Sequence, residues 1–174
     1  MALASTIYKA DLGIADMDRN HYASHSLTVA LHPSETLERM MVRILAFGLH
    51  AEEGLCFGRG LSSDEEPAIQ KRNLTGDIEL WIDVGLPDAR SVRKACNRSD
   101  KVRIYAYGRA ARIWWPQQDF SRHENLCVIL LPDTAELEKL ASRSMNLDLS
   151  VQEGNIWIGN GQRSIHLEPI RLKG

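Results

Sequence analysis

Alternation of apolar and polar positions along the chain predicts a protein built from both strands and helices. Residues 78–84 alternate with a period of two, which is typical of a strand with one apolar face. Residues 126–131 form an unbroken apolar run, which favours a central strand. The strands predicted in this way cover residues 7–12, 22–31, 67–72, 78–84, 101–107, 126–131, 146–151, 155–158 and 164–170, and residues 56–61 form a short strand or a loop.

Apolar positions three and four residues apart predict the helices. The first helix covers residues 35–53, with Ser34 as its expected N-cap and Gly54 after its end. Further helices are predicted over 88–98, over 109–122 with a break at Pro116, and from Pro132-Asp133 to about Arg143. Helices and strands alternate between residues 85 and 131, so at least two strands there should be parallel. We therefore expect one mixed α/β domain over residues 1–174, with a mixed central sheet, flanking helices and a C-terminal β-meander.

Composition and charge narrow the class of protein. The chain has 174 residues, 44% of them hydrophobic, which is enough to build a core. Its net charge of -2 gives no overall basic footprint, but leaves room for an enzyme that touches nucleic acid through one local patch. We expect no membrane span and no signal peptide. Cys56, Cys96 and Cys127 lie far apart among mostly apolar neighbours, which predicts reduced core thiols in a cytoplasmic protein.

Acidic residues on the polar face of the 78–84 strand indicate a first candidate site. Glu79 and Asp83 flank Trp81 on that face, although an ordinary half-buried strand can carry the same pattern. Glu38 falls within the apolar arc of the first helix, where an unpaired carboxylate costs free energy. It either enters the same site or lies at the edge of the arc and reaches water or an arginine. Trp81 either packs against that helix beside Glu38 or lines a substrate pocket.

The preceding turn decides which residues face these acids. A two-residue turn pairs Ala68 with Asp83, and a four-residue turn pairs Glu66 with Asp83. Both place Glu66, Ala68 and Gln70 on the face of Glu79 and Asp83. Neighbouring carboxylates, with water and phosphate, are typical ligands of Mg²⁺, which can activate water for hydrolysis of a phosphodiester. The pattern therefore predicts a magnesium site on Glu66, Asp83 and Glu79.

Several segments carry a more specific pattern, and together they span nearly the whole chain. They are Asp16–Arg19, His32–Thr36, Glu38–Arg43, Glu79–Gly85, Pro87-Asp88, Arg93–Ala95, Arg143–Met145 and Asn155–Trp157. In these segments the chain resembles the bacterial YaeQ family. The resemblance implies a variant of the PD-(D/E)XK nuclease fold, which is the fold of restriction endonucleases. It implies no established reaction, and a link to transcription elongation has been proposed for the family.

The nuclease pattern that the resemblance implies is incomplete here. It requires an Asp early in one strand and (Asp/Glu)-x-Lys in the next. Glu66 stands in place of the Asp, and Gly85 stands where the lysine should follow Asp83. Lys94 on the next helix and Gln70 are the candidates to position water instead, although the helical wheel turns Lys94 away from the packing stripe of that helix. In this scheme Glu79 and Glu38 complete or order the site.

Two functions remain open from the sequence. The leading hypothesis is a magnesium-dependent nuclease or phosphodiesterase that acts on DNA or RNA. The alternative is a non-catalytic protein that keeps the fold and uses the acidic pocket for binding, in connection with transcription. The oligomeric state is left open.

Weaker signals come from histidine and tryptophan pairs. His21 and His25 either share a zinc site or lie on a strand surface. Trp114-Trp115, with Arg109 and Arg112, either stack on bases or form core and rim.

Overall fold

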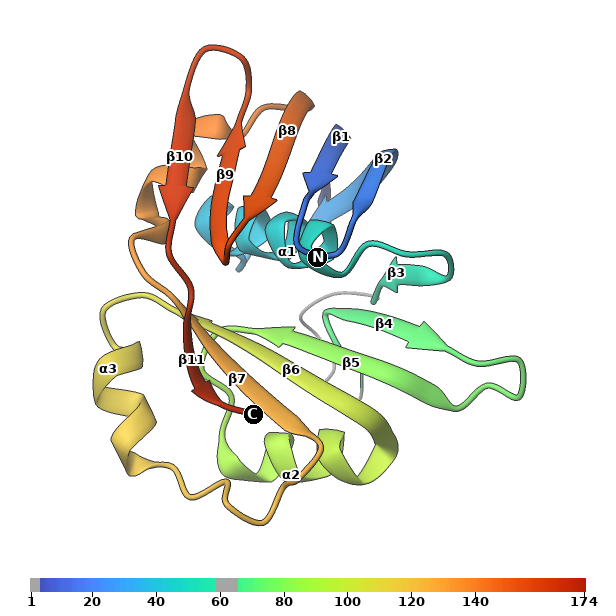
Figure 1. Cartoon of the computed structure of the whole chain (residues 1–174), viewed down its shortest axis with the longest axis vertical. Helices are drawn as coiled ribbons and strands as arrows, with labels where there is room; N and C mark the ends of the chain where they lie inside the picture. The colour runs from blue at the N-terminus through green and yellow to red at the C-terminus, as the bar shows by residue number, and fades with distance from the viewer. Residues whose placement is uncertain (1–3, 59–65) are drawn as a thin grey trace.

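The computed structural model describes residues 4–58 and 66–174, in which two β-sheets enclose a helix (Figure 1). Sheet A has five strands in the order β10-β9-β8-β1-β2, and sheet B has six in the order β11-β7-β6-β5-β4-β3. Sheet A contains β1 (Thr6–Asp16), β2 (His21–Leu31), β8 (Ser144–Gln152), β9 (Asn155–Gly159) and β10 (Ser164–Leu167). Sheet B contains β3 (Leu55–Phe57), β4 (Ile69–Arg72), β5 (Ile78–Val84), β6 (Ser99–Tyr107), β7 (Leu126–Leu131) and β11 (Ile170–Lys173). The α-helices are α1 (Leu37–His50), α2 (Ala89–Arg98) and α3 (Ala111–Trp114), and the 3₁₀ helices are η1 (Trp115–Gln117) and η2 (Thr134–Leu140).

Helix α1 lies between the two sheets (Figure 1), and every residue from Met40 to Gly48 is buried. Apart from Arg43, the buried stretch is apolar, and one hydrophobic cluster joins α1 to the inner faces of both sheets. At Gly48 a Cβ atom would lie 2.5 Å from Leu149 Cδ2, so the close approach to sheet A requires glycine. Helix α2 covers the other face of sheet B. The layers are therefore sheet A, α1, sheet B and α2.

Two arginines fix the ends of α1. Arg43, which is 4% exposed, bonds both carboxylate oxygens of Glu35 at 2.7 Å and a backbone carbonyl of β2 at 3.0 Å. Arg19 is held by Asp16 and donates to two backbone carbonyls at the end of α1, at 3.1 and 3.2 Å. Buried charges and the last carbonyl groups of a helix both need such partners. These ionic contacts therefore set the position of α1 against sheet A.

Sheet B contains both antiparallel and parallel strand pairs. Strands β3, β4 and β5 are antiparallel, whereas β5, β6 and β7 are parallel and are joined by crossovers that contain α2 and α3. The final strand, β11, pairs antiparallel with β7. The prediction of parallel strands between residues 85 and 131 is thus confirmed.

A β-bulge interrupts the pairing of β4 with β5. Lys71 lies opposite Leu80, whereas the next residue of β4, Arg72, lies opposite Ile78. Glu79 is therefore an extra residue in β5, and the alternation of side chains between the two faces shifts there. Ile78 consequently packs in the cluster under α2.

A mixed α+β domain is confirmed, but the expectation of one central sheet is wrong. Strand β1 pairs in parallel with β8, so the N-terminal hairpin and the C-terminal meander form a separate sheet. The strand predicted over residues 164–170 is in fact two strands, β10 and β11, which belong to different sheets. Alternation within a segment predicts a strand but not the strand with which it pairs. For this reason the division into two sheets was not predicted.

Three predictions of helices need correction. Helix α1 begins after Thr36, whose side chain accepts a hydrogen bond from the Arg39 N–H at 3.1 Å, so Thr36 and not Ser34 is the N-cap. The predicted helix around Pro116 is only α3 followed by the single 3₁₀ turn η1. After Pro132, Asp133 has a φ of 59° and the 3₁₀ helix η2 follows, where an α-helix was expected.

The cysteines are less uniform than predicted. Cys127 is buried, as expected of a core thiol, but Cys96 is half-buried and Cys56 is exposed. All three are free. Within residues 4–58 and 66–174, no helix combines the length and the apolar character needed to cross a membrane.

Candidate functional site

Asp83 lies near the end of β5 with its carboxylate held in a fixed orientation. Its Oδ1 accepts a hydrogen bond from the backbone N–H of Ala68 at 3.1 Å, and its Oδ2 accepts one from Trp81 Nε1 at 2.7 Å. Trp81 is 2% exposed and packs under α2, so the expectation that it packs against α1 beside Glu38 is wrong. These two donors hold one oxygen each and so fix the plane of the carboxylate.

Gln70 lies on β4, the strand that pairs with the strand of Asp83, and Glu66 lies in the segment that leads into β4. Gln70 is directly opposite Trp81, which places it on the Asp83 face of the sheet. Its Oε1 atom is buried and has no hydrogen-bond partner among the described residues. The register continues to Ala68 opposite Asp83, so that pairing is confirmed and the pairing of Glu66 with Asp83 is wrong. The predicted two-residue turn is also wrong, because residues 73–77 join the strands and Arg72 lies opposite Ile78. Glu66 is half-buried in a bend two residues before Ala68.

Glu79 does not share this face, contrary to the prediction. The bulge turns it towards α1, where its carboxylate lies 3.5 Å from Lys71 Nζ, and Lys71 also pairs with Glu52 at 3.3 Å. Glu79 helps to line a hollow of about 470 Å³ that includes His50 and Arg103. A strict period of two in the sequence gave the wrong face, because one inserted residue reverses the alternation.

Glu38 occupies a third position. It lies in the first turn of α1 and lines a hollow of about 470 Å³ at the carboxyl ends of β6 and β7, together with Arg109, Arg112 and Asp133. Burial raises the pKa of Glu38, and the nearby Glu138 raises it further. The structure thus separates the predicted residues. Gln70 shares the face of Asp83 and Glu66 lies two residues before Ala68, whereas Glu79 and Glu38 line two other hollows.

Gly85 follows Asp83 with a φ of +108°, a backbone conformation that side chains other than glycine rarely adopt. Its N–H donates to the Tyr105 carbonyl at 2.9 Å, which holds this turn against β6. A lysine at this position would be strained, so the local backbone explains its absence. Lys94 lies on α2, the helix that covers the Asp83 face, and is half-buried beside Ala95.

A histidine that lines the hollow containing Glu79 contacts a buried tyrosine behind it, and sequence reasoning missed both. The His50 Nε2 and Tyr105 Oη atoms are 2.5 Å apart. The pKa of His50 is lowered to about 4, mainly by burial; Arg103 and Arg19 add to the lowering, and Asp16 opposes it. Burial also raises the pKa of Tyr105 above its usual range. The two residues are 55 positions apart, and no local pattern in the sequence links them.

The weaker candidates have structural surroundings. The rings of His21 and His25 stack with centroids 6.0 Å apart, and His25 faces inward onto Phe47, so they are not surface histidines. Their Nε2 atoms are buried without a hydrogen-bond partner in the described chain. Trp114 donates from Nε1 to the Pro87 carbonyl at 3.1 Å, as expected of a core and rim position.

Comparison with known proteins agrees with this architecture over the whole chain. The family model described as YaeQ protein matches residues 1–169. The chain belongs to the YaeQ family. It is 44% identical to the YaeQ protein of Salmonella typhi over 173 residues, which cover 97% of this chain and 96% of that protein. The YaeQ protein of Escherichia coli K12 is also 44% identical, over 96% of this chain and 95% of its own.

Two crystal structures of YaeQ proteins have the same fold. The protein from Xanthomonas axonopodis pv. citri superposes with a TM-score of 0.94 at 46% identity, covering 98% of this chain and 99% of that one. The protein from Pseudomonas syringae gives a TM-score of 0.92 at 34% identity, covering 98% and 97%.

Many charged residues in the segments that resemble the YaeQ family have structural roles. The acids and arginines at the two ends of α1 hold that helix in place. Asp18 accepts hydrogen bonds from the backbone N–H groups of Glu153 and Gly154, at 2.7 and 2.8 Å, and so fixes the turn between β8 and β9. Asp83 differs from them, because the partners that orient its carboxylate include a backbone N–H and an indole N–H.

The donor set around Asp83 fits a divalent cation in part. It offers a carboxylate and the unpartnered amide oxygen of Gln70, both hard oxygen ligands, with Glu66 close in the chain. However, no group of three or more His, Cys, Asp and Glu side chains in the described chain is arranged to hold a metal ion. Water or substrate oxygens would have to supply the remaining positions, as is usual for Mg²⁺.

Proposed function

We propose that this YaeQ-family protein is a metal-dependent phosphodiesterase of the nuclease type, which acts on DNA or RNA through Mg²⁺ at Asp83. The observation that carries the proposal is the orientation of the Asp83 carboxylate by Ala68 and Trp81. On the same face lies the buried Gln70 Oε1, which has no hydrogen-bond partner within residues 4–58 and 66–174. Carboxylates that bind metals are themselves commonly fixed by outer hydrogen bonds. We assign the protein to the cytoplasm.

The residues of the chain have separate roles in this proposal. Asp83, Gln70 and Glu66 hold the cation, which when bound supplies an activated water and stabilises the leaving oxygen. Ala68 and Trp81 orient Asp83. Lys94, on the helix over the same face, takes the part of the lysine that Gly85 replaces.

The topology supports a PD-(D/E)XK core as part of this proposal. The nuclease pattern needs two neighbouring strands, one that carries an acid and a next one that carries (Asp/Glu)-x-Lys. Strands β4 and β5 are such a pair, with Glu66 before the first and Asp83 on the second. The pair is followed by α2 and the parallel strand β6.

A cleavage screen tests the reaction. Single- and double-stranded DNA and RNA are incubated with Mg²⁺ or Mn²⁺ and the wild type, Asp83→Asn or Glu79→Gln. Glu79→Gln is a matched control, because it removes one acid from the same strand on the opposite face. We expect cleavage by the wild type and by Glu79→Gln, and none by Asp83→Asn. Cleavage that survives Asp83→Asn would contradict the proposal, and thermal denaturation confirms that each variant is folded.

A second candidate is a non-catalytic binding protein that keeps the nuclease core, in connection with transcription. Two observations favour it: the positive φ of Gly85 would strain the motif lysine, and the bulge removes Glu79 from the site. Under this proposal the wild type binds Mg²⁺ and nucleic acid at Asp83 but cleaves none of the four substrates.

A further inference from the structure

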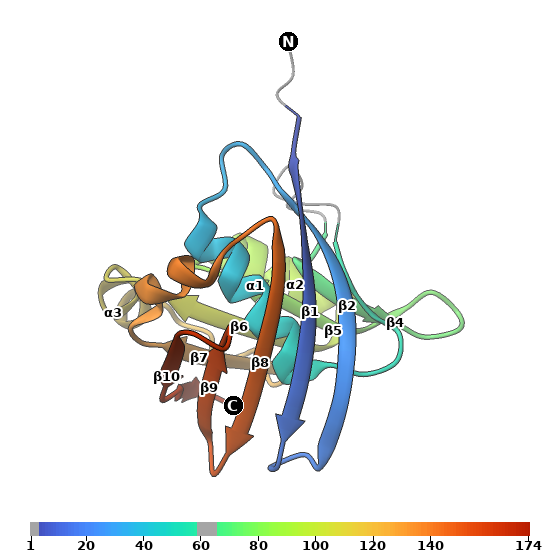
Figure 2. The same ribbon diagram turned by 90° about the horizontal axis from the view of Figure 1, so that it is seen from above.

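The outer face of sheet A is not covered by any described element. Figure 2 looks onto this face, with the five strands in front and α1 behind them. Alternate residues of β1, β8 and β9 are buried against α1, and the residues between them point outward. The outward set is mainly small and polar, but it contains Trp157, which is 37% exposed, and Tyr22, which is 60% exposed.

Strand register places these two aromatic residues in one row across the sheet. The row consists of Tyr22, Ala15, Ser150, Trp157 and His166, each directly opposite the next. The small side chains in its middle leave a trough between the aromatic residues.

The neighbouring row supplies the floor of the trough and its polar groups. It consists of Ser24, Gly13, Asp148, Gly159 and Ser164, again with direct cross-strand neighbours. Two of its five residues are glycines, which have no side chain to rise above the sheet. Asp148 is the single charged residue of the row.

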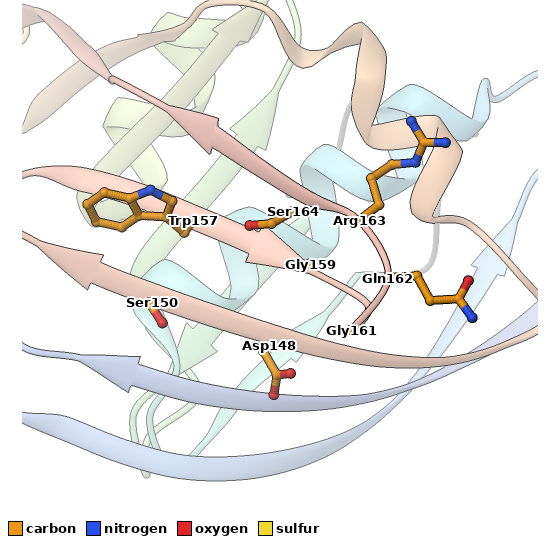
Figure 3. A pocket seen from close by; sticks show the side chains of 8 residues that line it. All are labelled: Asp148, Ser150, Trp157, Gly159, Gly161, Gln162, Arg163 and Ser164. Carbon is orange, nitrogen blue, oxygen red and sulfur yellow. The ribbon is translucent and has the colours of Figure 1, made fainter.

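One ring face of Trp157 is occupied and the other lies towards the trough. The Trp157 ring stacks on His166 with centroids 4.9 Å apart and an angle of 12° between the planes. Its other cross-strand neighbour is the small Ser150. A hollow of about 300 Å³ lies beside it, lined by Asp148, Ser150, Gly159 and residues of the β9–β10 turn that include Arg163 (Figure 3).

We propose that this hollow binds a nucleobase, with guanine as the best fit. The base stacks on the free face of Trp157, above Ser150, as bases stack on aromatic side chains of exposed sheets in RNA-binding proteins. Asp148 precedes Ser150 by two residues on the same face of β8, about 7 Å along the strand. At that distance its carboxylate meets the edge of a base that covers Ser150. Guanine presents two adjacent N–H donors, at N1 and N2, which match the two oxygens of a carboxylate.

The charges around the hollow favour a base at its centre with its phosphate at the rim. The carboxylate of Asp148, whose Oδ1 lies over Gly13 of β1, repels phosphate but accepts N–H donors. Arg163 lies at the far end, in the turn between β9 and β10 (Figure 3), where a guanidinium can pair with phosphate. The inference rests on the proposed function only for nucleic acid as the substrate class. It requires neither Asp83 nor a metal.

Calorimetric titration in a metal-free buffer with EDTA tests the proposal. The probes are GMP, UMP, a five-nucleotide single-stranded RNA with a central guanine, and methyl glucoside. The proteins are the wild type, Trp157→Ala, Trp157→Phe, Asp148→Asn and Asp83→Asn. Trp157→Phe is the matched control, because it keeps an aromatic ring in place.

We expect GMP to bind the wild type more tightly than UMP does. Trp157→Ala should weaken binding of GMP by at least about fivefold, and Trp157→Phe by less. Asp148→Asn should remove the preference for GMP. Asp83→Asn should bind as the wild type does, so failure here and failure of the metal site are distinguishable. Tighter binding of the RNA than of GMP would show that the site takes a base from a single strand. Equal binding of the two would show that it takes a free nucleotide. Both outcomes support a nucleobase site.

Three results would overturn the proposal. One is the absence of GMP and RNA binding to the folded wild type at millimolar concentration. Another is equal affinity of the wild type and Trp157→Ala. The third is binding of methyl glucoside in preference to GMP, which would make the hollow a sugar site.

Discussion

Replacement of His50 by glutamine should remove one identifiable part of the protein's sensitivity to acid. In the folded protein, burial lowers the pKa of His50 from its ordinary value of 6.5 to about 4. In the unfolded chain the imidazole takes up a proton at the ordinary value. The unfolded state therefore binds more protons between these two pH values. The stabilising contribution of neutral His50 is complete above pH 6.5 and is lost as the pH falls towards 4.

The magnitude follows from the separation of the two pKa values. Each pH unit of separation corresponds to about 1.4 kcal/mol. Between pH 7 and pH 4.5 the free energy of unfolding should fall by about 2 kcal/mol because of His50 alone. Such a loss is a large share of the roughly 5–15 kcal/mol that stabilises a typical domain. Urea denaturation of the wild type and His50→Gln at both pH values measures it.

Comparison with the variant isolates His50 from the other acid-sensitive groups. Acid-sensitive groups other than His50 are the same in both proteins, so their contributions cancel in the difference. Tyr105→Phe is a second control: it removes the hydrogen-bond partner but leaves His50 buried, and should keep most of the pH dependence. If the wild type and His50→Gln lose the same free energy of unfolding between pH 7 and 4.5, the reasoning is refuted.

Three further substitutions test the ionic anchor of α1 and the candidate site. Glu35→Gln should lower the free energy of unfolding by about 3 kcal/mol or more, because it leaves the buried Arg43 unpaired; a loss below about 1 kcal/mol in urea denaturation would contradict this. Gly85→Lys should destabilise the protein by about 1–3 kcal/mol and restore no cleavage, because φ is positive there; a stable variant with new nuclease activity would show the opposite. Trp81→Phe should weaken metal binding, measured by calorimetry, because it removes the N–H donor to Asp83 while an aromatic ring is kept; unchanged affinity would mean that this bond does not orient the carboxylate.

The strands were the most predictable part of the fold. Apolar runs such as 126–131 and the alternation of 22–31 each became a strand in the structure. Their division into two sheets was not predictable, because the parallel pairing of β1 with β8 joins segments at opposite ends of the chain. No pattern within β1 or β8 identifies the other strand as its partner. The packing of α1 between two sheets was visible only as an unusually broad apolar stripe.

The candidate site was predictable as far as local rules reach. The assumption of a turn with an even number of residues placed Gln70 and Ala68 on the face of Asp83, and the observed register confirms both positions. The same rule failed for Glu79, because a bulge is set by how strands fit together and leaves no mark in the alternation. The sequence predicted that Glu38 lies within the apolar arc of the first helix, and in the structure it lies on α1 over the carboxyl ends of β6 and β7. Its position depends on how α1 crosses sheet B.

The trough on sheet A depends on register in the same way. Tyr22 and Trp157 are more than 130 residues apart, and only the pairing of four strands brings them into one row. In the sequence Trp157 was simply part of a short strand.

Titration of Mn²⁺ into three proteins by calorimetry tests the central claim most directly. The proteins are the wild type, Asp83→Asn and Glu79→Gln, each shown to be folded by thermal denaturation. A site at Asp83 predicts that the wild type and Glu79→Gln bind with the same affinity, and that Asp83→Asn binds more than about tenfold more weakly. Equal affinity of the wild type and Asp83→Asn would contradict the claim. Loss of binding in Glu79→Gln alone would move the site to the hollow beside α1.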